Sequence, residues 1–265
     1  MSVGGFGLVM FNSVARWWRI FGTGVSFVVV GVGGVFVFPV LNIVIQKRQL
    51  RSMLARHVIT FSFRCIVALM RFMGVFRYEI TGIERLKRNG LLILANHPTL
   101  IDIVFLMAFV KHADCIVKNG LWRNPFTHST VRAAAYVRND NHGFQLIEDC
   151  VAAIHRGGNL IIFPEGTRTS NNGSFVLRRG AANIAVRGLC NITPVLIRCS
   201  PLMLAKGEKW WRLPHHPSHF TIAVKEDIDV QPFIARAGSE LLAVRHLTDY
   251  LQDYFMKEQP SHAVG

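Results

Sequence analysis

Two short polar runs follow strongly apolar stretches of this chain. Residues 96–102 read NHPTLID after the apolar run 91–95, and residues 163–169 read FPEGTRT at the end of the apolar run 159–163. Such apolar runs are typical of buried strands that lead into loops at one edge of a sheet. Open α/β folds bind their ligands at that edge. We therefore expect both runs to contribute to one site.

The first run contains His97 and Asp102, the residue types of a general base and the carboxylate that orients it. On an uninterrupted helix, residues five apart point about 140° away from each other. Pro98 permits a bend, because proline ends a strand and suits the first turn of a helix. If the side chains meet, Asp102 holds a proton on one imidazole nitrogen and the other nitrogen is free to accept one. A structural histidine at a strand end is the alternative.

The second run has the residue types of an anion site. Pro164 and Gly166 are typical of a turn, whose N–H groups can face an oxyanion together with the Thr167 hydroxyl. Arg168 offers a planar fork that matches phosphate. Phosphate is the expected ligand, and a simple tight connection is the alternative.

Positive charge is concentrated in the N-terminal part of the chain. Residues 1–78 contain nine Lys or Arg and no acidic residue, whereas the remaining residues carry 21 basic and 16 acidic groups. A basic segment with long apolar runs fits an anionic membrane surface and not nucleic acid. Membrane lipids are thus expected partners, and nucleic acid is not.

Residues 20–45 carry no charge and form, as a helix, a rod of about 39 Å, longer than a hydrocarbon core of about 30 Å. The heavier positive charge follows this run, which predicts that the rest of the chain faces the cytoplasm from the cytoplasmic membrane. A bent or re-entrant helix is an alternative because Gly31, Gly33, Gly34 and Pro39 interrupt the run, and a cleaved signal is another. Residues 48–73 predict a basic amphipathic helix that lies among headgroups or packs on the domain.

After residue 76, strands alternate with helices, which predicts an α/β fold with a mostly parallel sheet flanked by helices. We expect residues 1–76 to form a membrane-anchoring two-helix segment and residues 77–265 the main domain. Predicted strands are 75–81, 91–95, 115–117, 133–137, 160–163, 192–199 and 220–225; predicted helices are 101–110, 143–155, 177–187 and 239–257.

Metal binding is not expected from the remaining candidate ligands. The five cysteines are scattered without a C-x-x-C pair, and the histidines of the irregular loop 206–219 match no helical ligand pair. Because Trp210 and Trp211 lie in that loop, we expect it to touch the membrane.

Several motifs together resemble the glycerolipid acyltransferases, the family of 1-acyl-glycerol-3-phosphate acyltransferases. The resemblance extends from about residue 78 to about residue 201. Its points are Asn96 to Asp102, Lys118 with Leu121 and Pro125, Tyr136 to Arg138, Phe163 to Arg168, Arg179-Gly180, and Thr193 to Val195. The chain departs from the family at Ala133 to Ala135 and at Arg178, which leaves the acceptor open.

The resemblance implies transfer of an acyl group from acyl-ACP or acyl-CoA, as co-substrate without a further cofactor, to a lysophospholipid hydroxyl. It implies His97 and Asp102 as catalytic residues, and Asn96, Arg138, Glu165, Gly166, Thr167 and Arg168 as substrate-binding residues. A glycolipid, an ornithine-type lipid or a polyene lipid is an alternative acceptor. A membrane-anchored scaffold without activity is the alternative outside enzymes.

Overall fold

The computed structural model describes residues 3–139, 143–169 and 176–258, with a sheet of seven strands among them. The strands are β1 (Phe76–Thr81), β2 (Leu92–Ala95), β3 (Ala113–Lys118), β4 (Val137–Asn139), β5 (Asn159–Ile162), β6 (Ile192–Ser200) and β7 (Ser218–Val224). Their order is β1-β7-β6-β2-β5-β3-β4, and every neighbouring pair is parallel except β6 with β7. The predicted α/β class with a mostly parallel sheet is confirmed.

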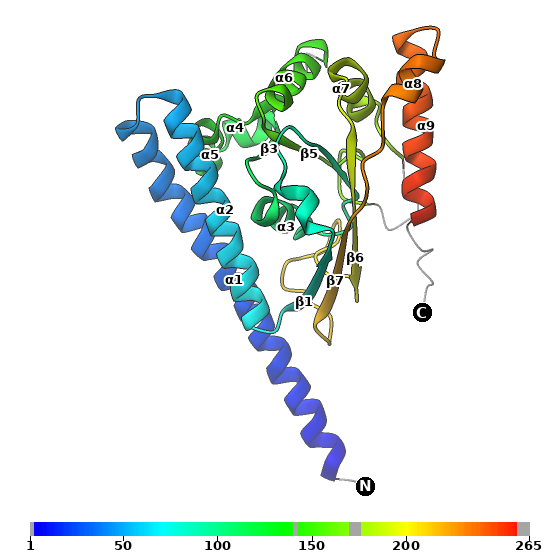
Figure 1. Cartoon of the computed structure of the whole chain (residues 1–265). Helices are drawn as coiled ribbons and strands as arrows, with labels where there is room; N and C mark the ends of the chain where they lie inside the picture. The colour runs from blue at the N-terminus through cyan, green and yellow to red at the C-terminus, as the bar shows by residue number, and fades with distance from the viewer. Residues whose placement is uncertain (1–2, 140–142, 170–175, 259–265) are drawn as a thin grey trace.

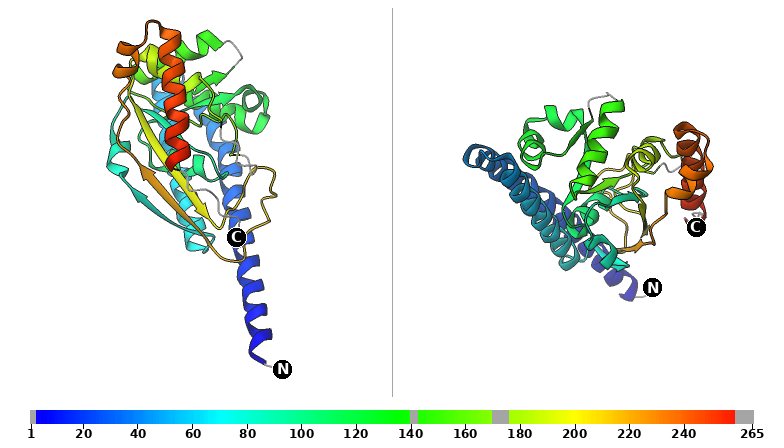
Figure 2. Two further views of the ribbon diagram at one scale, coloured as in Figure 1. Left: turned by 90° about the vertical axis from the view of Figure 1, so that its right-hand side faces the viewer. Right: turned by 45° about the horizontal axis from the view of Figure 1, so that its top comes forward.

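Helices cover both faces of the sheet (Figures 1 and 2). They are α1 (Val3–Val44), α2 (Arg48–Phe72), η1 (Ile83–Lys87), α3 (Asp102–Phe109), α4 (Asn119–Arg123), α5 (Pro125–Ala134), α6 (Gly143–His155), α7 (Gly180–Gly188), α8 (Gln231–Arg236) and α9 (Glu240–Glu258). One apolar core joins the sheet to α2, α3 and α5, and a second joins it to α6, α7 and α9. All four residues of β2 are buried, because both of its faces are covered.

The N-terminal helices form a hairpin that leans against one side of the sheet domain, and the N-terminal end of α1 projects beyond it (Figure 1). By length and composition, the segments Ser13–Val44 and Arg48–Phe72 are each long and apolar enough to cross a membrane. The helix α1 continues without interruption through Pro39. The predicted boundary at residue 76 falls at the first residue of β1.

The arginines of α2 do not form the free basic stripe that the sequence suggested. Arg56 pairs with Asp114, Arg64 donates from Nε to the Ala108 carbonyl, and Arg71 lies over the ring of Tyr78. Apolar side chains of α2 are exposed instead, with Phe61 69% and Phe72 85% exposed. The helix therefore turns these three arginines toward the domain and leaves an apolar face uncovered.

The predicted strand 133–137 is wrong. Ala133 and Ala134 end α5, which the Asn124 side chain caps and Pro125 begins. Ala135 follows the helix in a left-handed conformation, and the strand β4 starts only at Val137. Alanine has the highest helix propensity, and an N-terminal cap followed by proline is a strong start signal. The short helices α4 and α8 also lie where no helix was predicted.

The loop predicted over residues 206–219 ends earlier than expected, because β7 begins at Ser218. It packs against α1: Arg19 donates from Nη2 to the His215 carbonyl at 2.5 Å, and a Cβ at Gly24 would lie 3.3 Å from the Trp210 ring. Trp210 and Trp211 remain 43% and 46% exposed. The loop thus connects α1 to the sheet domain.

Candidate active site

The two polar runs lie side by side at the carboxyl edge of the sheet. The first leaves β2 and the second leaves β5, and these strands are parallel neighbours. Asn96 fixes the end of β2 to β6, since its Oδ1 accepts from the Ile197 N–H at 2.7 Å and its Nδ2 donates to the Ile197 carbonyl at 2.8 Å. The Asn96 side chain therefore bonds to the backbone of β6 and does not point toward the open edge of the sheet.

His97 and Asp102 form a hydrogen-bonded pair. The chain bends after Pro98, so that His97 stays on the loop and Asp102 becomes the first residue of α3. His97 Nδ1 lies 2.9 Å from Asp102 Oδ2, which also accepts from the Thr99 N–H at 2.6 Å. The Thr99 hydroxyl donates to Asp102 Oδ1 at 2.7 Å. Because every one of these donors is fixed, the carboxylate can hold the imidazole in one orientation and one tautomer.

Asp102 is fully buried. Burial raises the pKa of Asp102, and the hydrogen bonds from His97 and Thr99 oppose that rise because they stabilise the carboxylate. The His97 ring stacks on Phe163 with a centroid separation of 3.9 Å. Its Nε2 has no hydrogen-bond partner among the residues that the structure describes. Nε2 is thus available to a hydroxyl group.

Glu165 turns inward and ties the two runs together. Its Oε1 accepts from the His97 N–H at 3.1 Å and from the Thr169 hydroxyl at 2.9 Å, and the Thr169 N–H donates to the His97 carbonyl at 2.7 Å. Burial raises the pKa of Glu165. Through these contacts, Glu165 holds the two polar runs in position relative to each other.

The turn of the second run is shaped for glycine. Gly166 has φ +71°, and a Cβ there would lie 2.8 Å from Arg178 Nε. Its N–H donates to the Phe163 carbonyl at 2.9 Å, so this N–H does not face a ligand as expected. Within the described part of the chain, the backbone N–H groups of Thr167 and Arg168 donate to no backbone carbonyl. These two N–H groups are therefore the donors of the turn that a ligand can use.

Arg168 lies on the same side of the molecule as His97, but only part of its fork is free. Its Nη1 donates to the Leu204 and Ala205 carbonyls, each at 2.9 Å, and Leu204 O also accepts from the Leu100 N–H at 3.1 Å. The loop after β6 thus holds one guanidinium nitrogen. The expectation of a free bidentate fork is therefore corrected, because only Nε and Nη2 lack a hydrogen-bond partner among the described residues.

Arg138 lies farther from His97 than the other predicted site residues. It is on β4, two strands and therefore about 10 Å from β5. Its Nη2 donates to Asn119 Oδ1 at 3.1 Å, and its guanidinium lies 5.6 Å from the Trp122 ring centroid. Between the two, Lys118 donates from Nζ to the Gly166 carbonyl at 3.3 Å. A row of cations therefore extends along the edge from Arg168 to Arg138.

Two residues that the sequence prediction did not select are built into the site. Thr99 supplies two of the three hydrogen bonds that Asp102 receives, and Phe163 forms the floor under the imidazole. The spacing of Thr99, three residues before an acidic residue at a helix start, is close to a capping pattern and could have identified it. Phe163 begins the second run, but its residue type alone does not distinguish it from an ordinary core residue.

The fold and this edge define an α/β protein with a His–Asp pair beside a polar turn. Residues 77–198 match the family model described as Acyltransferase. The 1-acyl-sn-glycerol-3-phosphate acyltransferase of Helicobacter pylori is 31% identical over 131 residues, 45% of this chain and 55% of that protein. The enzyme of the same name from Borreliella burgdorferi is 23% identical over 140 residues, 51% of this chain and 56% of that protein.

A solved structure extends the likeness to the whole fold. The crystal structure of the 1-acyl-sn-glycerophosphate (LPA) acyltransferase PlsC from Thermotoga maritima superposes with a TM-score of 0.63, covering 95% of this chain and 98% of that one at 21% identity. Over residues 77–198 the chain is thus similar to 1-acyl-sn-glycerol-3-phosphate acyltransferases, and over most of its length it shares the fold of the PlsC structure. It spans about half the length of the curated relatives that it matches.

Proposed function

We propose that this protein transfers a fatty acyl group from a thioester, acyl-ACP or acyl-CoA, to the hydroxyl of a lysophospholipid, most simply 1-acyl-glycerol-3-phosphate. The observation that carries the proposal is the His97–Asp102 pair at 2.9 Å beside a turn rich in cations and free N–H groups. A base next to an anion-binding turn fits an acceptor that has both a hydroxyl and a phosphate. The names of the relatives support the same acceptor class.

In the proposed reaction, His97 Nε2 accepts the proton of the acceptor hydroxyl as its oxygen attacks the thioester carbonyl carbon. The N–H groups of Thr167 and Arg168 stabilise the negative charge on the carbonyl oxygen of the tetrahedral intermediate. The C–S bond then breaks, and His97 returns the proton to the thiolate that leaves. Asp102 stabilises the imidazolium throughout, and no acyl group is attached to the protein.

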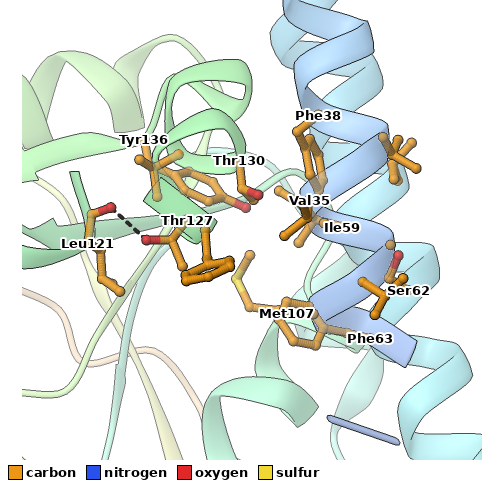
Figure 3. Close-up of a pocket in the computed structure, with 18 of the residues that line it drawn as sticks. Val35, Phe38, Ile59, Ser62, Phe63, Met107, Leu121, Thr127, Thr130 and Tyr136 are labelled. Carbon is orange, nitrogen blue, oxygen red and sulfur yellow. Dashed lines mark hydrogen bonds between the residues drawn. The ribbon is translucent and has the colours of Figure 1, made fainter. Parts of the chain in front are cut away.

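The acyl chain has a suitable cavity beside the site. An apolar cavity of about 730 Å³ lies between α1, α2, α3 and α5 (Figure 3). Its wall includes Val35, Ile59, Phe63 and Met107. Asp102 is the first residue of α3, and Met107 lies in the same helix. Ligand pockets of about 300–1,000 Å³ lined by apolar side chains are usual for such ligands.

Narrowing this cavity should change which acyl chains react. Val35→Trp places a larger side chain at the α1 wall, and we expect the preferred donor to become shorter because a long chain no longer fits. Competition between donors of different chain length, with products separated by mass spectrometry, measures the preference. Val40→Trp is the matched control, since Val40 is 57% exposed on the same helix and does not line the cavity. If Val35→Trp prefers the same donor chain length as the wild type, the acyl chain does not bind in this cavity.

Arg168→Ala should act on the acceptor more than on the donor. Loss of a charge-assisted hydrogen bond of about 1.5–3 kcal/mol corresponds to a rise of about 10- to 100-fold in the acceptor's KM. Because Arg168 also holds the loop after β6, the variant could lose stability, so its melting temperature and the donor's KM are measured together with the acceptor's KM. Arg236→Ala, an exposed arginine of α8, is the control. Equal rises in both KM values would argue against a phosphate contact.

Attachment to the cytoplasmic membrane, with the sheet domain on the cytoplasmic side, is part of the proposal. The exposed apolar faces of α1 and α2 support it. Such an arrangement brings the site to substrates that reside in a bilayer.

Lipid mass spectrometry tests the proposed function. Membranes containing the protein are incubated with acyl-ACP or acyl-CoA and with a panel of acceptors that includes 1-acyl-glycerol-3-phosphate, a glycolipid and an ornithine-type lipid. We expect phosphatidate to be the main new product. Acylation of a different lipid would support the alternative acceptor, and no acylated product with any donor would leave the scaffold alternative.

A further inference from the structure

A second, strongly basic cavity lies away from the two polar runs. It has a volume of about 520 Å³ and is formed where the start of α2, the end of α5, β4 and α6 meet. Its walls carry the guanidinium groups of Arg48, Arg51, Arg132, Arg138 and Arg156, and we call it the arginine pocket. None of His97, Asp102 or residues 163–169 lines it. It therefore lies outside the two polar runs and shares only Arg138 with the row of cations described above.

The described residues do not balance the charges of the arginine pocket. Asp149 is the one acidic residue among the described residues of its wall, and Asp149 Oδ1 accepts from Gln145 at 3.2 Å. None of the five arginines forms an ion pair with a carboxylate in the described ranges. Elsewhere arginines are paired, as Arg88 is with Asp227 at 2.7 Å and Arg187 with Glu240 at 2.6 Å. Like charges brought together repel, so the pocket favours an anion.

Two buried donors in the wall also lack partners. Arg51 Nε and Trp122 Nε1 are buried without a hydrogen-bond partner in the described chain. A buried N–H left unpaired costs about 1–3 kcal/mol, and such groups in native proteins usually have a ligand or water. Both groups are donors, so the missing partner is an acceptor. Arg138 is already oriented, since it donates to Asn119 and lies over the Trp122 ring.

We propose that the arginine pocket binds a phosphate group at a site distinct from the one where acyl transfer is proposed. Phosphate has the charge and the several acceptor oxygens that guanidinium groups and N–H donors recognise. Two sources present this chemistry. One is the headgroup of an anionic membrane lipid, because Arg48 and Arg51 directly follow the turn between α1 and α2. The other is a soluble phosphate ester, such as the nucleotide part of coenzyme A.

Binding of inorganic pyrophosphate to the full chain in non-ionic detergent micelles tests the site without any turnover. We compare the wild type with R132Q/R156Q by calorimetric titration at low ionic strength. Loss of two guanidinium contacts should raise the Kd about tenfold or more, since each tenfold step corresponds to about 1.4 kcal/mol. The control R236Q/R245Q removes the same charge from exposed positions of α8 and α9 and should keep the wild-type Kd.

R48Q is the second variant, because it alters the α2 wall without touching α5 or α6, and it should also weaken binding. Equal Kd values for the wild type and both pocket variants, or no binding by the wild type, would overturn the proposal. Either result would leave the proposed acyl transfer unaffected.

The source of the phosphate is distinguished by two further arms. In the first, coenzyme A competes with pyrophosphate in micelles; in the second, phosphatidylcholine vesicles with and without phosphatidylglycerol are floated with the protein. Displacement of pyrophosphate by coenzyme A supports a soluble ester. Binding that increases with phosphatidylglycerol in the wild type and the control, but not in R132Q/R156Q, supports a lipid headgroup.

Discussion

Replacing His97 by alanine is expected to lower kcat/KM for acyl transfer by about 10²- to 10⁴-fold, the usual contribution of a general base. The structure gives the physical reason. The imidazole is held by Asp102 at Nδ1 and by the Phe163 ring beneath it, while Nε2 has no partner among the described residues. A steady-state assay of thiol release in the presence of acceptor measures the change.

The control for this variant is His246→Ala, because His246 is exposed on α9, far along the chain from both polar runs. It should keep wild-type activity. Membrane association and melting temperature of both variants are measured beside activity, so that loss of folding is not read as loss of the base. Wild-type turnover by a folded His97→Ala protein would eliminate the assignment.

Two variants of Asp102 separate the effect of its negative charge from its effect on the orientation of the His97 imidazole. In Asp102→Ala the imidazole loses its hydrogen bond and both Thr99 donors lose their acceptor, so we expect nearly the same loss of kcat/KM as in His97→Ala. In Asp102→Asn the amide oxygen can still accept from His97 and from the Thr99 N–H. That variant retains orientation but lacks the charge that stabilises imidazolium, so we expect a smaller loss, about 10²-fold.

The stabilities of the two Asp102 variants should change in opposite directions. Burial raises the pKa of Asp102, so its contribution to the free energy of unfolding is lost as pH rises through the raised pKa. Asp102→Asn does not titrate, and its melting temperature should exceed that of the wild type by a margin that widens as pH rises through that pKa. Asp102→Ala should melt below the wild type, because the buried Thr99 groups are unpaired.

Non-additivity checks that His97 and Asp102 act as a unit. The double variant His97→Ala/Asp102→Ala should be no less active than His97→Ala alone, because the carboxylate works only through the imidazole. Independent, multiplying losses would show that Asp102 has a different role.

Much of the fold could be predicted because its signals are local. Apolar runs such as 91–95 and 159–163 favour buried strands of a parallel sheet, and α6 (Gly143–His155) has the predicted bounds. The strand prediction for residues 133–137 was wrong because an apolar run of that length fits a helix end as well as a strand. The N-cap at Asn124 starts a helix that continues into this run, so the helix is recognised only when its start, nine residues upstream, is taken into account.

The part of the site that could be predicted is the part whose residues all lie in one short segment. His97, Pro98 and Asp102 lie within six residues, so their bend can be reasoned from proline geometry alone. The bonds of Arg168 to Leu204 and Ala205 join segments 36 and 37 residues apart, and the loop that supplies these carbonyls has no sequence pattern. The arginine pocket collects side chains from α2, α5, β4 and α6, which only the packing of the helical hairpin on the sheet domain brings together.

The most direct measurement uses the purified full chain, an acyl thioester and 1-acyl-glycerol-3-phosphate, and follows thiol and phosphatidate together. Direct acyl transfer from the thioester to the acceptor hydroxyl, with His97 as the base, predicts that thiol is released only when acceptor is present, mole for mole with phosphatidate, and that His97→Ala loses both in parallel. Thiol release at the same rate without acceptor, or phosphatidate formed equally well by the wild type and His97→Ala, would contradict it.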